Sequence, residues 1–148
     1  DATSGTITEV TTLGGAPVSL SDGNVTLTNA THSGRVLLVP DGGQDNTYTL
    51  PAPIAGSMFR FVYAGGAADA TDAIIITPGN TNFYIGGITF LDTDGNAISS
   101  VFSNGSSNSS IQFNVPAGFD VTIMGLNTTN YQIFGNATST TAPAFADQ

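Results

Sequence analysis

Hydrophobic and polar residues alternate along most of this chain in short runs, which is the pattern of β-strands with one buried face. Residues 57–64, "SMFRFVYA", place their aromatic side chains on one face and Met58, Arg60 and Val62 on the other. Residues 119–126, "FDVTIMGL", alternate in the same way. Because the aromatic side of the first run is the better core, we expect Arg60 to lie on the opposite face.

Runs of this kind, rich in Val, Ile, Thr and aromatic residues, are separated by Gly, Asn, Asp, Ser and Pro and predict about eleven strands. The expected strands are residues 5–10, 24–30, 35–40, 47–51, 57–64, 73–78, 83–91, 97–102, 110–115, 119–126 and 130–135. The 18 glycines and seven prolines argue against long helices. The sequence therefore predicts an all-β fold: an antiparallel, jelly-roll-like β-sandwich, or alternatively a β-barrel or β-tulip-like fold.

The length of 148 residues predicts a single β domain spanning residues 1–148. Two terminal segments are expected to extend from it as arms: residues 1–20 and residues 136–148. The C-terminal segment is polar and needs a partner surface to be ordered, with Phe145 as its anchor. The alternative is that this tail packs on its own domain.

The charge of the chain limits the kinds of molecule that it is expected to bind. The net charge of −9 disfavours nucleic acid and anionic membranes, and no apolar run is long enough to span a bilayer. Charged residues make up only 9% of the chain, against about a quarter in an average domain. Hydroxyls and amides are easier to desolvate than ions, so this composition favours contact with other protein surfaces.

Residues suited to catalysis are scarce. The chain has one histidine, His32, one glutamate, Glu9, and no cysteine, and it contains no G-x-S-x-G motif. His32 precedes an expected strand, where a role in a turn or cap is commoner than catalysis. The acids lie mainly in turns, where Asp has a local backbone role. We expect no enzymatic activity and no cofactor.

One acidic turn offers a candidate metal site. The segment "DTDGN" places Asp92, Asp94 and Asn96 at alternate positions, so that three oxygen ligands could face one Ca²⁺. The glycine comes two positions too early for an EF-hand loop and no glutamate follows. An ordinary hairpin turn is the alternative.

Carbohydrate binding is a further alternative, because sugar sites use exposed aromatic and amide side chains. Tyr84, Tyr131 and Asn130 are the candidates in this chain. The two tyrosines could equally be core residues with a solvated hydroxyl.

The partner of Arg60 has two explanations. Arg60 could reach an acid of its own chain, or its face could be buried against a neighbouring subunit that supplies the acid. We favour the second. The expected interface residues are Arg35, Met58, Arg60, Val62 and Phe145.

Residues 24–77, with their "NVTLT" strand, the corner "TLPAPIAGSMFRF" and the strand "AIIIT", resemble head decoration (cement) proteins of tailed bacteriophages. The later segments "AGFDVTIMGL" and "NYQIFG" continue the likeness, which covers about two thirds of the chain. The Asn- and Ser-rich loop at residues 104–110 departs from the pattern.

The resemblance implies a small, non-enzymatic virion protein. Such proteins are commonly trimeric, bind the major capsid protein on the outer surface of the shell, and stabilise it. The expectation is therefore a homotrimeric decoration protein located on the virion, whose arms extend its grip. The alternative from another class is a carbohydrate-binding or adhesin-like β-sandwich module of a fibre, pilin-like or surface-layer subunit.

Overall fold

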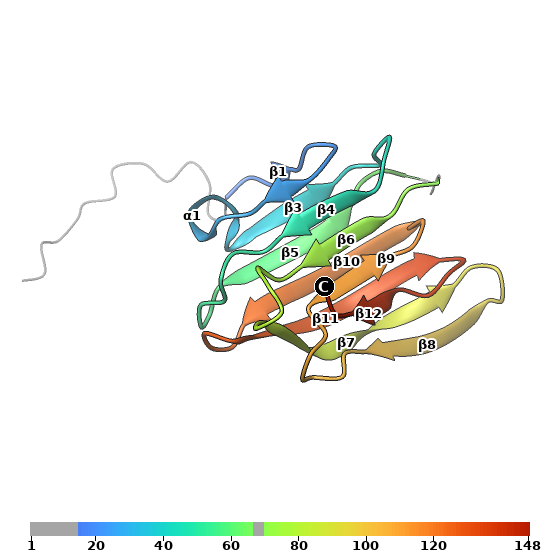
Figure 1. The fold of residues 1–148 in the computed structure, drawn as a ribbon. Coiled ribbons are helices and arrows are strands. Elements are labelled where there is room, and N and C mark those ends of the chain that lie inside the picture. The colour runs from blue at the N-terminus through green and yellow to red at the C-terminus, as the bar shows by residue number, and fades with distance from the viewer. Residues whose placement is uncertain (1–14, 67–69) are drawn as a thin grey trace, which may run out of the picture.

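The alternating runs form two β-sheets that face each other (Figure 1), in a computed structural model that describes residues 15–66 and 70–148. In order from edge to edge, the seven-stranded sheet consists of β1 (Val18–Ser19), β3 (Arg35–Val39), β5 (Met58–Tyr63), β10 (Gly118–Gly125), β11 (Asn130–Ser139), β7 (Phe83–Asp92) and β8 (Ala97–Phe102). The five-stranded sheet consists of β12 (Ala144–Ala146), β9 (Ser110–Phe113), β6 (Ala73–Ile76), β4 (Asn46–Thr49) and β2 (Val25–Thr26). The prediction of an all-β sandwich is confirmed.

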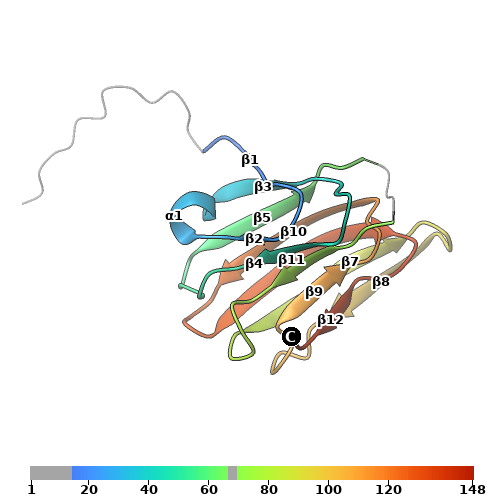
Figure 2. The ribbon, with the colours of Figure 1, turned by 45° about the horizontal axis from the view of Figure 1, so that its top comes forward.

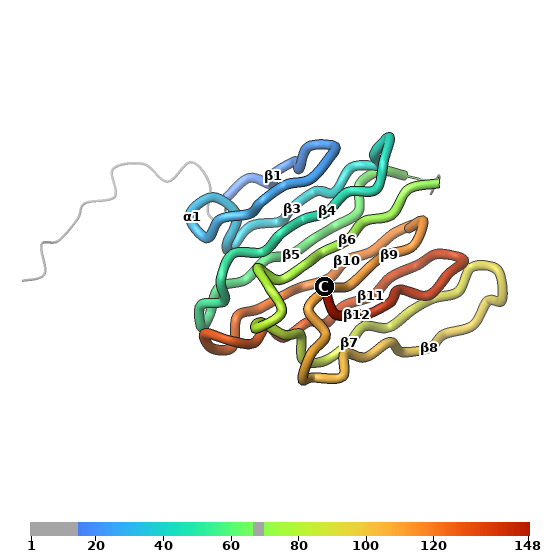
Figure 3. The backbone as a smooth tube through the Cα atoms, in the orientation of Figure 1, coloured from blue at the N-terminus to red at the C-terminus, as the bar shows by residue number. Residues whose placement is uncertain are grey.

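The first six strands alternate between the two sheets, so this half of the chain winds as a flattened coil (Figure 3). Each return to a sheet lays the new strand parallel to the previous one: β1, β3 and β5 in one sheet, and β2, β4 and β6 in the other. From β7 onwards most neighbours are antiparallel, although β11 pairs with β7 in parallel.

This winding corrects the predicted architecture. Both sheets are mixed, and they do not follow the all-antiparallel arrangement expected of a jelly roll. Both sheets are also open, with edge strands at each end, so they do not form the closed barrel that was the alternative. Strand alternation predicts which side of a strand is buried, but it carries no information about the direction of the neighbouring strand.

The core fills the space between the sheets, and aromatic side chains dominate it. The rings of Phe113 and Phe119 stack with centroids 4.2 Å apart, and Phe59 meets Tyr131 edge-on at 6.4 Å. The hydroxyl of the buried Tyr84 donates a hydrogen bond to the Ile75 carbonyl, at 3.1 Å. This bond joins the two sheets and satisfies a polar group that would be costly to bury alone.

Most predicted strands from residue 35 onwards are confirmed within a few residues, and β8 matches its predicted bounds. The expected strand at residues 24–30 is shorter, because the chain turns into a short helix, α1 (Asn29–His32), seen at one end of the sandwich in Figure 2. Thr28 caps this helix, since its hydroxyl accepts a hydrogen bond from the Thr31 amide. The expected strand at residues 5–10 lies outside the described residues.

The prediction of a C-terminal arm at residues 136–148 needs correction. Residues 136–139 belong to β11, and β12 pairs with β9, so the tail completes the five-stranded sheet. The Phe145 ring packs against Tyr84 at 6.0 Å, and the Gln148 side chain donates to the Thr77 carbonyl at 2.8 Å. The domain's own core therefore orders the tail. Of the predicted N-terminal arm, residues 1–14 lie outside the described residues, and Val18–Ser19 pair with β3.

Candidate functional site

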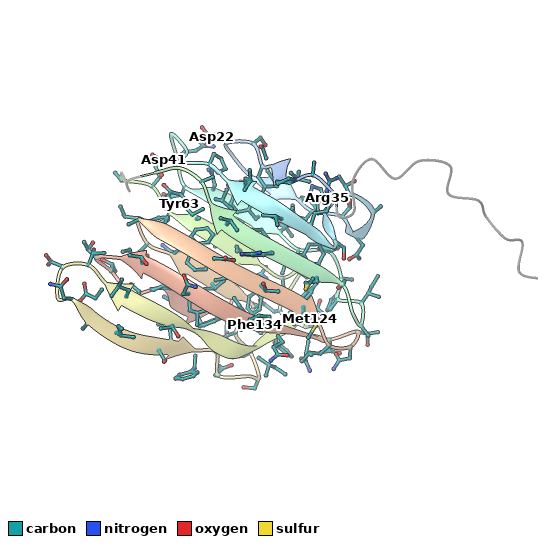
Figure 4. The ribbon with its side chains drawn as sticks, turned by 180° about the vertical axis from the view of Figure 1, so that it is seen from behind. Asp22, Arg35, Asp41, Tyr63, Met124 and Phe134 are labelled. Carbon is teal, nitrogen blue, oxygen red and sulfur yellow. The ribbon has the colours of Figure 1, made fainter. Side chains whose placement is uncertain are left out.

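The polar-side positions of the seven-stranded sheet form one broad surface that no described element covers (Figure 4). We call this surface the outer face. Its residues are Val36 and Leu38 of β3; Met58, Arg60 and Val62 of β5; Asp120, Thr122 and Met124 of β10; Gln132, Phe134, Asn136 and Thr138 of β11; Ile85, Gly87, Thr89 and Leu91 of β7; and Ile98, Ser100 and Phe102 of β8.

Large apolar side chains are exposed on this face and not on the opposite one. Among the described residues, six of the eight exposed large hydrophobic residues belong to the outer face: Met58, Ile85, Leu91, Ile98, Phe102 and Phe134. The other two, Ile54 and Leu126, lie in the loops before β5 and after β10. No strand of the five-stranded sheet contributes to this set.

The apolar area that these six side chains expose can be compared with that of a typical monomer. With a large side chain exposing roughly 200 Å² when free, the six together present on the order of 600 Å². That value is at the upper end of the roughly 300–600 Å² reached by the largest apolar patch of a typical monomer. The largest apolar patch of a monomer is often functional, so the outer face is a candidate site for binding another molecule.

Two phenylalanines define the centre and rim of the patch. Phe134 pairs with Thr122 of β10, and on its other side the register of β11 with β7 places it beside Gly87. Gly87 pairs in turn with Phe102 of β8. A Cβ atom on Gly87 would lie 2.8 Å from the Phe102 ring, so the ring lies over the glycine. The absence of a side chain at position 87 leaves room for the Phe102 ring.

One ion pair lies within the apolar surroundings. The Arg60 guanidinium donates from Nε to Asp120 Oδ1 at 2.8 Å and from Nη2 to Asp120 Oδ2 at 2.5 Å. Val62 is directly opposite Asp120, and Thr122 directly opposite Arg60, so the pair runs diagonally between β5 and β10. The carboxylate that Arg60 contacts therefore belongs to its own chain.

The pair is neutral overall and leaves the face without net charge. The other acids of the described residues lie in turns, at strand ends or near the C-terminus: Asp22, Asp41, Asp45, Asp72, Asp92, Asp94 and Asp147. Although the chain carries a net charge of −9, none of the excess negative charge of the described residues lies on the outer face.

Arg60 also sets the ionisation of Asp120. Its hydrogen bonds and charge hold the pKa of the Asp120 carboxyl below the usual range, against a smaller opposing effect of partial burial. A carboxyl with a depressed folded-state pKa adds stability above its unfolded pKa of about 3.9, and this contribution is lost as the pH falls further. The two side chains are 50% and 37% exposed, so the gain in folding stability is small.

We expect NMR titration of the Asp120 carboxyl to show a midpoint below about 3.9 that rises in Arg60→Met. Arg35→Met is the matched control, because it removes the other basic side chain without touching Asp120. An Asp120 midpoint that is the same in wild type and Arg60→Met would rule out the pair in solution.

The structure brings together three of the five predicted interface residues, Met58, Arg60 and Val62. Arg35 lies elsewhere: its register partner is the buried Phe59, and its guanidinium donates to the Ala16 carbonyl. Phe145 lies apart from these three on the five-stranded sheet, where its partly buried ring packs against Tyr84 of the core.

Sequence reasoning missed Asp120, Phe134, Ile98 and Phe102 as members of this face. A lone acid among alternating apolar positions was the available signal for Asp120. However, nothing in the sequence indicates that β10 lies next to β5.

The predicted metal ligands form an ordinary turn. Asp92 Oδ1 accepts the Asp94 amide at 2.9 Å, and Asn96 adopts a positive φ of 50° in the β7–β8 connection. Backbone hydrogen bonding thus accounts for Asp92. Within residues 15–66 and 70–148, no three histidine or acidic side chains gather in a metal-binding arrangement.

The tyrosines of the carbohydrate-binding alternative are core residues. Tyr84 and Tyr131 are fully buried, and their hydroxyls donate to the carbonyls of Ile75 and Pro51. Neither ring is available to a sugar, so this part of the prediction is wrong. In the described part of the chain no pocket is present.

His32 has the structural role that its position predicted. It ends α1, and its Nδ1 accepts the Thr28 amide at 3.0 Å, which ties the end of the helix to its start.

Comparisons with known proteins add no assignment: neither family models, nor curated proteins, nor solved structures include a match to this chain. Across the residues that the structure describes, no helix is long and apolar enough to cross a bilayer.

Proposed function

We propose that this chain is a non-enzymatic structural protein that binds the surface of another protein through its outer face. The observation that carries the proposal is the apolar, charge-neutral surface of the seven-stranded sheet, beside a five-stranded sheet that exposes no large apolar side chain. An interface core of this kind has aromatic residues, methionine and arginine in place of isolated charges.

Within this class, we propose a head decoration protein of a tailed bacteriophage, bound as a trimer to the outer surface of the capsid. The support is the resemblance of residues 24–77, together with an acidic, lysine-free chain whose composition disfavours nucleic acid. A protein in this role stabilises a shell by burying apolar surface across the boundaries between capsid subunits. Closed symmetry multiplies such a contact by avidity.

The binding test is cosedimentation with empty shells assembled from the major capsid protein of the same virus. Wild type is expected to sediment with the shells. Phe134→Asp places an unpaired charge at the centre of the patch and should weaken binding at least tenfold, as expected for a central aromatic anchor. Ala144→Asp is the matched control, because it adds the same charge on the exposed side of β12 in the other sheet.

Three results separate the parts of this proposal. If wild type fails to sediment with the shells, the proposed binding to the capsid is wrong. If Phe134→Asp and Ala144→Asp lose binding equally, the proposed binding through the outer face is wrong. Loss in Ala144→Asp alone assigns binding to the five-stranded sheet instead.

A further inference from the structure

The four sheet edges of this sandwich differ sharply in length. Three end in very short strands: β1 and β2 have two residues each, and β12 has three. The fourth edge is β8, with six residues, at the lower border of the molecule in Figure 1. Natural proteins shorten their edge strands because unpaired backbone groups recruit other strands.

β8 also lacks the other protections of an edge strand. Its sequence, "AISSVF", contains no charge and no proline, and Ile98 and Phe102 are 76% and 70% exposed. Lysine, proline or a bulge usually prevents an exposed edge from pairing. The β8 edge is thus long, neutral and apolar, whereas the other three edge strands are short. Such an edge is suited to pair with a further strand.

The hydrogen-bond pattern shows which backbone groups are available. The Ser103 amide donates to the Gly86 carbonyl of β7 at 3.0 Å, so the backbone groups of Ser103 point towards β7. In an antiparallel strand the backbone groups of successive residues point alternately towards the two neighbouring positions in the sheet. The amides and carbonyls of Ile98, Ser100 and Phe102 therefore point away from β7, to the open edge. No hydrogen bond from another described element reaches them.

We propose that β8 pairs antiparallel with β8 of a second copy of this chain, about a two-fold axis at Ser100. Side chains directly opposite each other must share a face, so Ser100 meets the partner's Ser100 and Ile98 meets the partner's Phe102. These are the positions whose backbone groups point outwards, so each of the opposed pairs exchanges two hydrogen bonds. The apolar positions on either side of Ser100 make the strand complementary to itself.

This register keeps the acidic turns of the two copies apart, although Asp147 lies beside the loop that each turn meets, since the Asn108 side chain donates to its Oδ1 at 3.3 Å. The acidic turn of one copy, with Asp92 and Asp94, does not meet the same turn of the other. In this register Asn96 falls opposite the partner's Asn104, so the turn lies beside the neutral loop 104–110. That loop is held in shape by Asn104 Oδ1, which accepts the amides of three following residues.

The pairing is two-fold, so it joins lone chains into dimers and joins neighbours within any larger assembly. A single edge strand buries less than the roughly 1,600 Å² of a standard interface, so the association is weak and depends on concentration. It does not depend on the proposed function, because it involves only copies of this chain.

The experiment uses cysteine, which the chain lacks. Across the two-fold axis, the Cα atoms of the two copies of residue 100 lie about 5.5 Å apart, within the range that a disulfide spans. Ser100→Cys should therefore give a covalent dimer on mild oxidation. Ser99→Cys is the matched control, because its two copies are offset along the strands by two residues, beyond that range. Equal yields of dimer from the two variants would overturn the register.

A second variant tests the edge without cysteine. Ser100→Pro removes an amide that points away from β7, so the fold tolerates it while strand pairing is blocked. Sedimentation of the full chain over increasing concentration should show that the species present at low concentration associates in pairs in wild type and does not do so in Ser100→Pro. A wild type that shows no such pairing, or pairing that persists unchanged in Ser100→Pro, contradicts the proposal.

Discussion

Replacing Gly135 with alanine should destabilise the domain by about 2–5 kcal/mol, combining a strained backbone with a steric clash. Gly135 lies in β11 at a φ of 142°, in the region that favours glycine. A Cβ atom there would lie 2.2 Å from the Asp120 carbonyl oxygen and 2.7 Å from the Val121 Cα. Both atoms belong to the β10 backbone and cannot move aside as a side chain would, so β10 and β11 must separate in the middle of the seven-stranded sheet.

Gly118→Ala is the matched control, because Gly118 belongs to the same strand pair, has no positive φ, and has open space where its Cβ would lie. Urea unfolding should show a large fall in the midpoint for Gly135→Ala and almost none for Gly118→Ala. Equal midpoints for the two variants would mean that the close approach of β10 and β11 at Gly135 is absent in solution.

Alkaline pH should unfold this protein, because three core tyrosines must stay neutral. Burial raises the pKa of Tyr48 to about 12, and it also raises the pKa values of Tyr84 and Tyr131 above their ordinary value. The Tyr48 hydroxyl has no hydrogen-bond partner among the described residues. The nearby Asn46 side chain nevertheless offsets part of the rise in the Tyr48 pKa. Unfolded tyrosine ionises near pH 10, so the unfolded chain loses protons that the folded chain retains.

The stabilisation from these neutral tyrosines is complete below about pH 10 and is lost as the pH rises towards the folded pKa values. The loss is at most about 1.4 kcal/mol per tyrosine for each pH unit. Urea midpoints measured from neutral to strongly alkaline pH should fall steeply above that point, together with the appearance of tyrosinate absorbance. Tyr131→Phe should reduce the slope. The fourth tyrosine, Tyr63, is only half-buried, so it is tyrosinate absorbance from more than one tyrosine before the fold is lost that would contradict burial of these hydroxyls.

Strand alternation alone predicted which residues of each strand are buried and which lie on the outer face. It placed Phe59 and Phe61 inside with Arg60 outside, and it placed Val121 and Ile123 inside, as the structure confirms. Side-chain direction follows a period of two wherever one face is buried, so these assignments needed no knowledge of the neighbouring strands.

Strand neighbours could not be predicted in this way. β5 and β10 are adjacent although about 60 residues separate Arg60 from Asp120, so the acid that pairs with Arg60 was not identifiable from the sequence. The parallel coil of the first six strands was missed for the same reason. The C-terminal tail was predicted as an arm because its composition is polar, yet Phe145 and a strand of only three residues are enough to hold it in place.

The central claim is that the outer face is covered by another protein in the native assembly. Thiol labelling tests it directly, because the chain has no cysteine. Thr89→Cys places a thiol on the exposed outer face, and Ala144→Cys places one on the exposed side of the five-stranded sheet. Both should react quickly in the free protein, and in the native assembly only Thr89→Cys should become protected. Labelling of Thr89→Cys in the assembly at the rate of the free protein would contradict the account.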